Sequence, residues 1–180
     1  ADTGEVFLSQ KQIERGKEVF HLRGLMGYGS FWGDGGDRGP DFTADALHRT
    51  EVSMREYYTR QMLAQTGAAA LTEYERDAIG QRVMREMRNN TFDEAAGTIT
   101  LNSAQMNAFE ELNVHYTRMF TDPPYKDRME PINQVNGEEN IRAVTGFFFW
   151  GGWVSAANRP GKTYSYTHNW PYDELVGNRP

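Results

Sequence analysis

The segment spanning residues 137–157 constrains the fold more than any other part of the chain. It contains the run Phe147-Phe148-Phe149-Trp150-Gly151-Gly152-Trp153 and is apolar almost all the way round a helix. Such a helix is either the centre of a core or a surface for a protein partner or a membrane interface, and the residues leave both open. Its inward-facing positions are expected to be Ile141, Val144, Phe148 and Val154.

Capping residues and apolar residues at helical spacing predict four more helices, so the expected fold class is mainly α. The first begins at Ser9 and ends at Gly24, and the second begins at Thr43, reaches about Gln65 and ends at Gly67. Their expected buried residues are Ile13, Val19, Phe20 and Leu22 in the first helix, and Leu47, Met54, Tyr58 and Met62 in the second.

The other two helices flank a short extended region. The third begins with the Thr72–Glu75 capping box, and the fourth begins at Ser103. Between them, residues 97–101 alternate in polarity and predict a short hairpin with residues 91–92. The expected buried faces are Ile79, Val83 and Met87 in the third helix, and Met106, Phe109, Leu112, Tyr116 and Phe120 in the fourth.

The remaining segments lack periodicity. Residues 27–40 contain six glycines and predict a shaped loop anchored by Tyr28, Phe31 and Trp32. A polar connector leads to residue 136, and the aromatic tail over residues 158–180 is expected to be extended and to lie on the surface. No repeat or linker divides the chain, so residues 1–180 are interpreted as one domain with a helical core over about residues 9–157.

Composition excludes several kinds of chemistry. The chain has no cysteine, which rules out disulfides, thiol catalysis, cysteine-ligated metals and thioether-attached haem. It has 19 Lys and Arg against 25 Asp and Glu, a net charge of −6, and no basic cluster, so nucleic acid is not an expected partner. The longest apolar stretch, residues 144–157, falls short of the roughly 20 residues that span a bilayer.

No motif predicts a catalytic or metal site. The histidines at positions 21, 48, 115 and 168 lack the spacing of metal ligands, and no nucleotide-binding or hydrolase motif occurs. Asp34, Asp37, Asp41 and Asp45 do not match a calcium-binding loop. Asp41 is instead expected just before a helix and Asp45 in its first turn, where carboxylates favour the helix dipole.

The first helix, with Gln12, Gly16 and Phe20, resembles the first helix of class I c-type cytochromes, although an ordinary amphipathic helix explains it equally well. The haem-attachment motif that would follow is missing. A cytochrome-like scaffold would then need apolar bulk in place of the porphyrin, and the candidate residues are Met26, Tyr28, Phe31, Trp32 and Met54.

Two longer regions closely resemble the hydrophilic region of the large subunit of quinol-dependent nitric oxide reductases. They are residues 24–33 with 39–49, and residues 148–153 with 158–171, followed by Gly177 and Asn178. The resemblance implies a cytochrome c-like domain without haem, on the extracytoplasmic (periplasmic) side of the bacterial cytoplasmic membrane. The parent enzyme of this haem–copper oxidase superfamily reduces two NO to N2O and water, with b-type haems and non-haem iron in its membrane part.

The same resemblance implies that this domain has no catalytic, cofactor or metal site of its own. Its expected partners are the transmembrane bundle of the same polypeptide and, in the parent enzyme, quinol; a homo-oligomer is left open. The tail is expected to lead to a membrane segment, and the residues expected near the membrane and the quinol are Trp150, Trp153, Arg159, Tyr164, Tyr166, His168 and Trp170. Asp34 stands where family members commonly have histidine, so no role carries over to it.

Two other functions are left open. The domain could bind haem without a covalent bond, or another small ligand, with His48 or His21 and Met54 as axial ligands. Alternatively, it could be a free-standing interaction module.

Overall fold

The computed structural model describes residues 8–122 and 135–179, and these residues are mainly helical. The main helices are α1 (Gln10–Leu22), α2 (Phe42–Thr66), α3 (Glu73–Arg88), α4 (Ser103–Thr121) and α6 (Glu138–Ala156). A 3-10 turn, η1 (Leu25–Gly27), and two antiparallel pairs, β1 (Ser30–Phe31) with β2 (Asp34–Gly35) and β3 (Phe92–Asp93) with β4 (Thr98–Ile99), complete it. The mainly α fold class is confirmed. The predicted connector falls largely outside the described residues.

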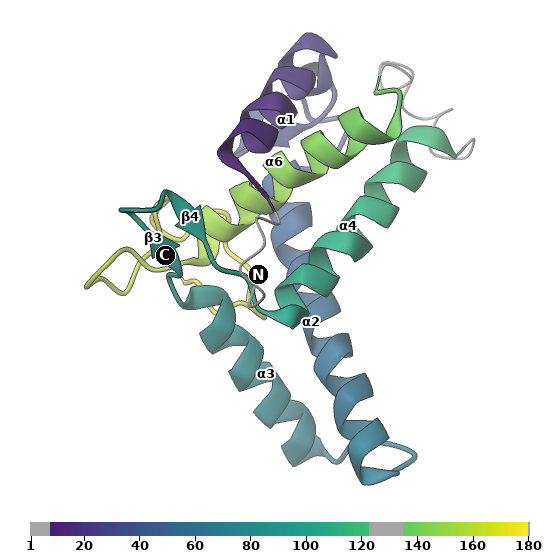
Figure 1. Ribbon diagram of the computed structural model, residues 1–180, viewed down its shortest axis with the longest axis vertical. Helices are drawn as coiled ribbons and strands as arrows, with labels where there is room; N and C mark the ends of the chain where they lie inside the picture. Colours follow the sequence, from purple (N-terminus) through teal and green to yellow (C-terminus); the bar gives the residue numbers. More distant parts are fainter. Residues whose placement is uncertain (1–7, 123–134, 180) are drawn as a thin grey trace.

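Helix α6 is the central helix of the core. Helices α1, α2 and α4 pack around it (Figure 1), and most of its residues are buried, including Ile141, Val144, Phe148 and Val154 as predicted. Phe148 stacks on Phe42 of α2 at 4.4 Å between ring centroids and meets Tyr116 of α4 edge-on at 5.0 Å. Of the two interpretations of this segment, the structure therefore supports the core helix.

Glycine lets α1 approach α6 closely. A Cβ atom at Gly16 would overlap the carbonyl group of Ala143 and the Cβ of Phe147. One turn further along α1, Phe20 is buried and its ring meets Phe148 edge-on at 5.9 Å. The prediction that Leu22 is buried is wrong: its side chain is 71% exposed, because it lies in the last turn of α1, beyond this contact.

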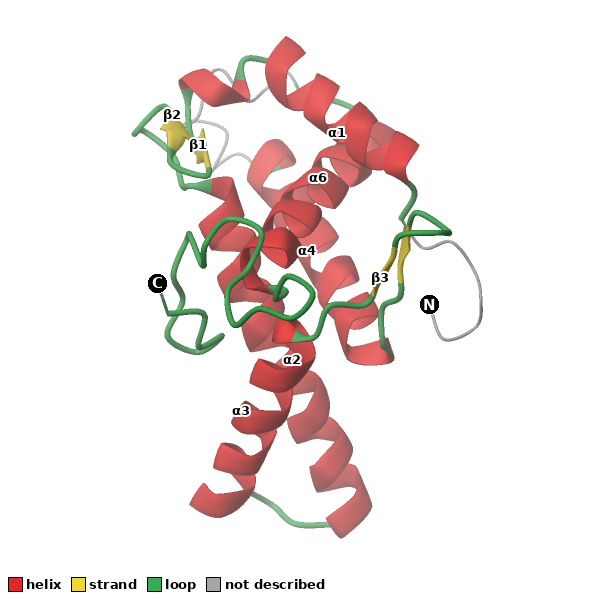
Figure 2. Cartoon of the chain, turned by 90° about the vertical axis from the view of Figure 1, so that its left-hand side faces the viewer, coloured by secondary structure: helices red, strands yellow, loops and turns green. Residues whose placement is uncertain are grey.

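Helices α2 and α3 form a hairpin that projects from the rest of the molecule (Figure 2). Gly67 ends α2, as predicted, and adopts the left-handed conformation. The predicted Thr72–Glu75 capping box begins α3. The predicted buried residues of α3 are all buried, and they pack in a second apolar cluster with residues of α2 that include Leu47, Met54 and Tyr58.

Two helix starts differ from the prediction by one or two residues. Asp41, rather than Thr43, caps α2: its Oδ1 accepts from the amide of Ala44, while the hydroxyl of Thr43 accepts from the amide of Trp32. Asn102, rather than Ser103, caps α4 and forms a capping box with Gln105. In both cases another residue able to cap stands next to or near the expected one, and only the backbone geometry decides between them.

The glycine-rich loop contains a strand pair that the sequence does not predict. β1 and β2 form a two-residue pair within it, and Gly35, at φ 140°, lies so close to Ser30 that a side chain there would overlap it. Tyr28 and Phe31 are buried and anchor the loop as predicted, whereas Trp32 is half-buried. The predicted hairpin is confirmed as β3 and β4, with Phe92 opposite Ile99.

The tail is folded against the helices, and the prediction that it is extended on the surface is wrong. Val176 and Asn178 are fully buried. The Asn178 amide donates to the carbonyl oxygens of Ser155 (3.1 Å) and Pro171 (2.8 Å), and the Arg88 guanidinium donates to the carbonyl oxygen of Gly177 (2.8 Å). These side-chain hydrogen bonds hold the backbone of the tail in place, although the tail forms no regular helix.

A half-buried carboxylate joins α2 to α4. Asp45 accepts hydrogen bonds from Tyr116 Oη and Arg49 Nε, both at 2.8 Å, and His115 Nε2 lies 3.4 Å from it. Burial alone would raise the pKa of Asp45, but His115, Arg49 and Tyr116 together outweigh it and hold this pKa below its ordinary value.

Replacing Gly16 tests the approach of α1 to α6. Alanine is the better helix former, so any loss of stability for Gly16→Ala reports the overlap with α6. We expect urea unfolding followed by circular dichroism to give a free energy of unfolding lower by about 1–3 kcal/mol. Gly27→Ala is the matched control, because a Cβ there meets no atom within 4 Å; equal effects of the two substitutions would contradict this packing.

The Asp45 cluster predicts a pH-dependent loss of stability. Because the pKa of Asp45 is lowered in the folded chain, its contribution is present above its unfolded pKa of about 3.9 and is lost as pH falls through the lower folded value. Asp45→Asn should lower the free energy of unfolding by about 1.5–3 kcal/mol at pH 7, and the difference from wild type should shrink in acid. The exposed Asp34→Asn serves as control; a difference for Asp45→Asn that does not change with pH would refute the assignment.

Candidate functional site

Five of the seven residues predicted near a membrane form one continuous stack. The Trp153 ring lies on Tyr166 at 6.1 Å, the Arg159 guanidinium lies 5.7 Å from Tyr166 and 6.0 Å from Tyr164, and Tyr164 stacks on His168 at 5.1 Å. We call these five residues the Arg159 stack. It joins the buried end of α6 to the exposed His168, so aromatic and cationic groups run from the core to the surface.

Backbone and side-chain hydrogen bonds hold the stack in place. Arg159 Nη2 donates to the carbonyl oxygen of Tyr166 (2.8 Å), and Asn90 Nδ2 donates to the hydroxyl of Tyr166 (2.8 Å). His168 and Asn169 adopt left-handed φ values of 55° and 65°, which non-glycine residues seldom do. The side-chain oxygen of Asn169 accepts from the amide of Ser165 at 2.8 Å, which helps to fix this turn.

The other two predicted residues lie outside the stack. Trp150 is half-buried and packs against Trp32 (5.7 Å) and Phe147 (6.1 Å). Trp170 is 54% exposed and lies above Gly33 in the glycine-rich loop. With the exposed Tyr172, which is not among the predicted residues, Trp170 gives the tail an aromatic surface.

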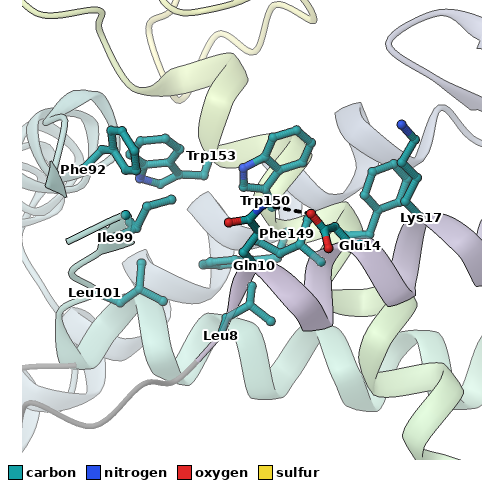
Figure 3. A pocket seen from close by; sticks show the side chains of 13 residues that line it. Leu8, Gln10, Glu14, Lys17, Phe92, Ile99, Leu101, Phe149, Trp150 and Trp153 are labelled. Atoms are coloured by element: carbon teal, nitrogen blue, oxygen red, sulfur yellow. Dashed lines mark hydrogen bonds between the residues drawn. The ribbon is translucent and has the colours of Figure 1, made fainter. Parts of the chain in front are cut away.

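A groove of about 450 Å³ lies between α1, α6 and the β3–β4 hairpin (Figure 3). Trp150 and Trp153 both line it, so the structure places these two side chains along a groove of this chain. The remaining lining residues are mostly apolar: Leu8, Gln10, Ile13, Glu14, Lys17, Phe92, Gly97, Ile99, Leu101, Phe147 and Phe149.

Sequence reasoning missed most of this lining, although one signal was present. Gln10, Ile13, Glu14 and Lys17 recur at the spacing of a single helix face, which indicates one shared surface on α1. Nothing in the sequence shows that the predicted hairpin lies opposite that face.

The residues considered as haem ligands are not brought together. His48 Nδ1 lies 2.9 Å from the carboxylate of Asp173, Met54 is buried in the cluster between α2 and α3, and His21 is exposed. Among the described residues, no histidine or methionine lines the groove. The donor set therefore does not fit a haem bound there by His and Met.

The five residues considered as a replacement for the porphyrin do not all lie in one cluster. Tyr28, Phe31, Met26 and Trp32 belong to the cluster around Phe20 and Phe148, whereas Met54 belongs to the other cluster. The bulk at the centre comes instead from Phe20, Phe42, Phe147, Phe148 and Tyr116.

Within the described ranges, no helix has both the length and the apolar character needed to cross a membrane, and no three His, Cys, Asp or Glu side chains are grouped to hold a metal ion.

Comparison with curated proteins and with models of protein families indicates where the chain belongs. No curated protein matched the chain. The model of the family described as the cytochrome c-like domain of the nitric oxide reductase protein NorB matches residues 1–172. The chain therefore belongs to the family of NorB cytochrome c-like domains of nitric oxide reductases.

Proposed function

We propose that this chain is the haem-free extracytoplasmic domain of a quinol-dependent nitric oxide reductase, and that it caps the transmembrane part of the enzyme near the quinol. The domain has no activity of its own; the reduction of two NO to N2O and water takes place in the membrane part, on b-type haems and non-haem iron. The family match over residues 1–172 is the observation that carries this proposal.

The interior supports a structural role for the domain. Cytochromes c hold their haem by His and Met, and a thioether bond needs cysteine, which this chain lacks. At the centre, Phe20, Phe42 and Phe148 contact one another at 4.4–6.0 Å between ring centroids. Packed rings stabilise a domain in the way a bound cofactor would, without its redox chemistry.

The tail supports a position next to the membrane. Trp170 and Tyr172 expose large aromatic surfaces, and the Arg159 stack connects this region to α6. Tryptophan and tyrosine favour the boundary between water and lipid because each combines an apolar ring with a polar group. We infer that this tail face is the side of the domain that meets the transmembrane bundle.

A haem titration tests the haem-free interior. Adding hemin in steps to the purified chain should give no saturable shift of the Soret band, because the centre is packed and the candidate ligands lie apart. Apomyoglobin is the positive control. A one-to-one complex with a shifted Soret band would favour the haem-binding alternative, and loss of that shift in His48→Ala would identify its ligand.

A substitution in the whole reductase tests the cap. Trp170→Ala should lower the Tm of the purified enzyme by about 2 °C or more, because a ring at the boundary loses its contacts, yet leave the Tm of the isolated chain nearly unchanged. Tyr74→Ala is the matched control, since Tyr74 is 83% exposed on α3, away from the tail. Equal Tm values for the enzymes carrying Trp170→Ala and Tyr74→Ala would refute the proposed orientation.

A further inference from the structure

The groove between α1, α6 and the β3–β4 hairpin has mostly apolar walls. Phe149 and Trp150 of α6 line it, and Phe92 and Ile99 line it from the hairpin (Figure 3). Trp153 contributes only its ring, because its Nε1 atom is buried. The volume of about 450 Å³ lies within the range of small-molecule sites, so the groove fits the apolar body of a ligand.

The charged side chains of the groove lie at one of its ends. In Figure 3, Phe92 lies at one end, whereas Glu14 and Lys17 of α1 lie at the other. A charged group is costly to bury among the aromatic rings and is tolerated at the α1 end, where these side chains are exposed. The groove therefore favours an amphiphile, a molecule with an apolar body and a polar group at one end.

Lys17 supplies the free charge at this end. Gln10 Nε2 donates to Glu14 Oε1 at 2.8 Å, so the carboxylate of Glu14 already has a donor. Among the described residues, Lys17 has no hydrogen-bond or ion-pair partner, and Figure 3 shows its amino group pointing away from Glu14. An unpaired ammonium group beside an apolar groove is complementary to a carboxylate.

We propose that this groove binds a free fatty acid, with the acyl chain along the aromatic wall and the carboxylate beside Lys17. Glu14 repels the carboxylate, so the head group lies on the side of Lys17 that faces away from Glu14. This site goes beyond the proposed role of the domain as a cap, because it depends only on α1, α6 and the hairpin.

A series of acyl chains tests the apolar part of the site. Octanoate, decanoate and dodecanoate are titrated into the purified chain by isothermal titration calorimetry, below the concentrations at which they form micelles. We expect saturable one-to-one binding. Each step of two methylene groups should lower the Kd by about fivefold to fifteenfold until the groove is filled, because each buried methylene adds a similar hydrophobic term.

A substitution in the hairpin locates the binding site. Phe92 is 45% exposed, so Phe92→Ala removes part of the groove wall without opening the core, and it should raise the Kd of decanoate by about threefold to tenfold. Tyr74→Ala is the matched control, because it removes another exposed ring on α3, away from the groove.

The position of the carboxylate is tested by comparing decanoate with decyl alcohol. The ratio of the Kd of the alcohol to that of the acid should fall about twofold to fivefold in Lys17→Gln, as expected for an exposed ion pair, and should rise in Glu14→Gln. Lys11→Gln is the control, because it changes the net charge equally at an exposed position of α1 that does not line the groove. Circular dichroism checks that the variants are folded.

Four results would overturn the proposal. The first is the absence of saturable binding of the acids, and the second is equal effects of Phe92→Ala and Tyr74→Ala. The third is an equal change of the ratio in Lys17→Gln and Lys11→Gln. The fourth is binding to phosphatidylcholine vesicles without binding of the acids, which would assign the groove to a bilayer lipid. None of these results bears on the cap, which the Tm of the whole enzyme tests independently.

Discussion

The structure depends on burying α6, a helix that is apolar almost all the way round. α6 is enclosed by α1, α2 and α4, so each of these helices must approach it closely. Small residues make this possible: Gly16 meets the backbone of α6, Gly151 accommodates the ring of Phe31, and Gly152 lies against the backbone of Leu47. A larger side chain at any of these three positions would force its neighbours apart, because packed interiors tolerate little change in volume.

The two sides of α6 have different consequences for function. On one side, Phe20, Phe42 and Phe148 fill the interior with contacting rings. On the other side, Trp150 and Trp153 line an open groove under the hairpin. The domain thus has a packed centre and a separate, mostly apolar groove.

The tail is held against the helices near both of its ends. Asn178 and Arg88 fix the end of the tail to α6 and α3, and Arg159 fixes its beginning through Tyr164 and Tyr166. Trp153 belongs both to the Arg159 stack and to the groove.

Local signals in the chain were sufficient to predict the helices and the family. Periodicity, the capping boxes at Ser9 and Thr72, and the glycine at position 67 predicted the helices, because these signals act within a few residues of one another. Two long motifs pointed to the family. The same signals could not distinguish a core from an interface for α6, since both bury the same apolar residues.

Only the tertiary structure shows that α6 is a core helix and that the tail folds against the helices. It also places Trp153 along the groove, together with Phe92 and Ile99. Each of these features joins residues that lie far apart in the sequence, through contacts that depend on how the helices are arranged in space and leave no periodic signal in the chain.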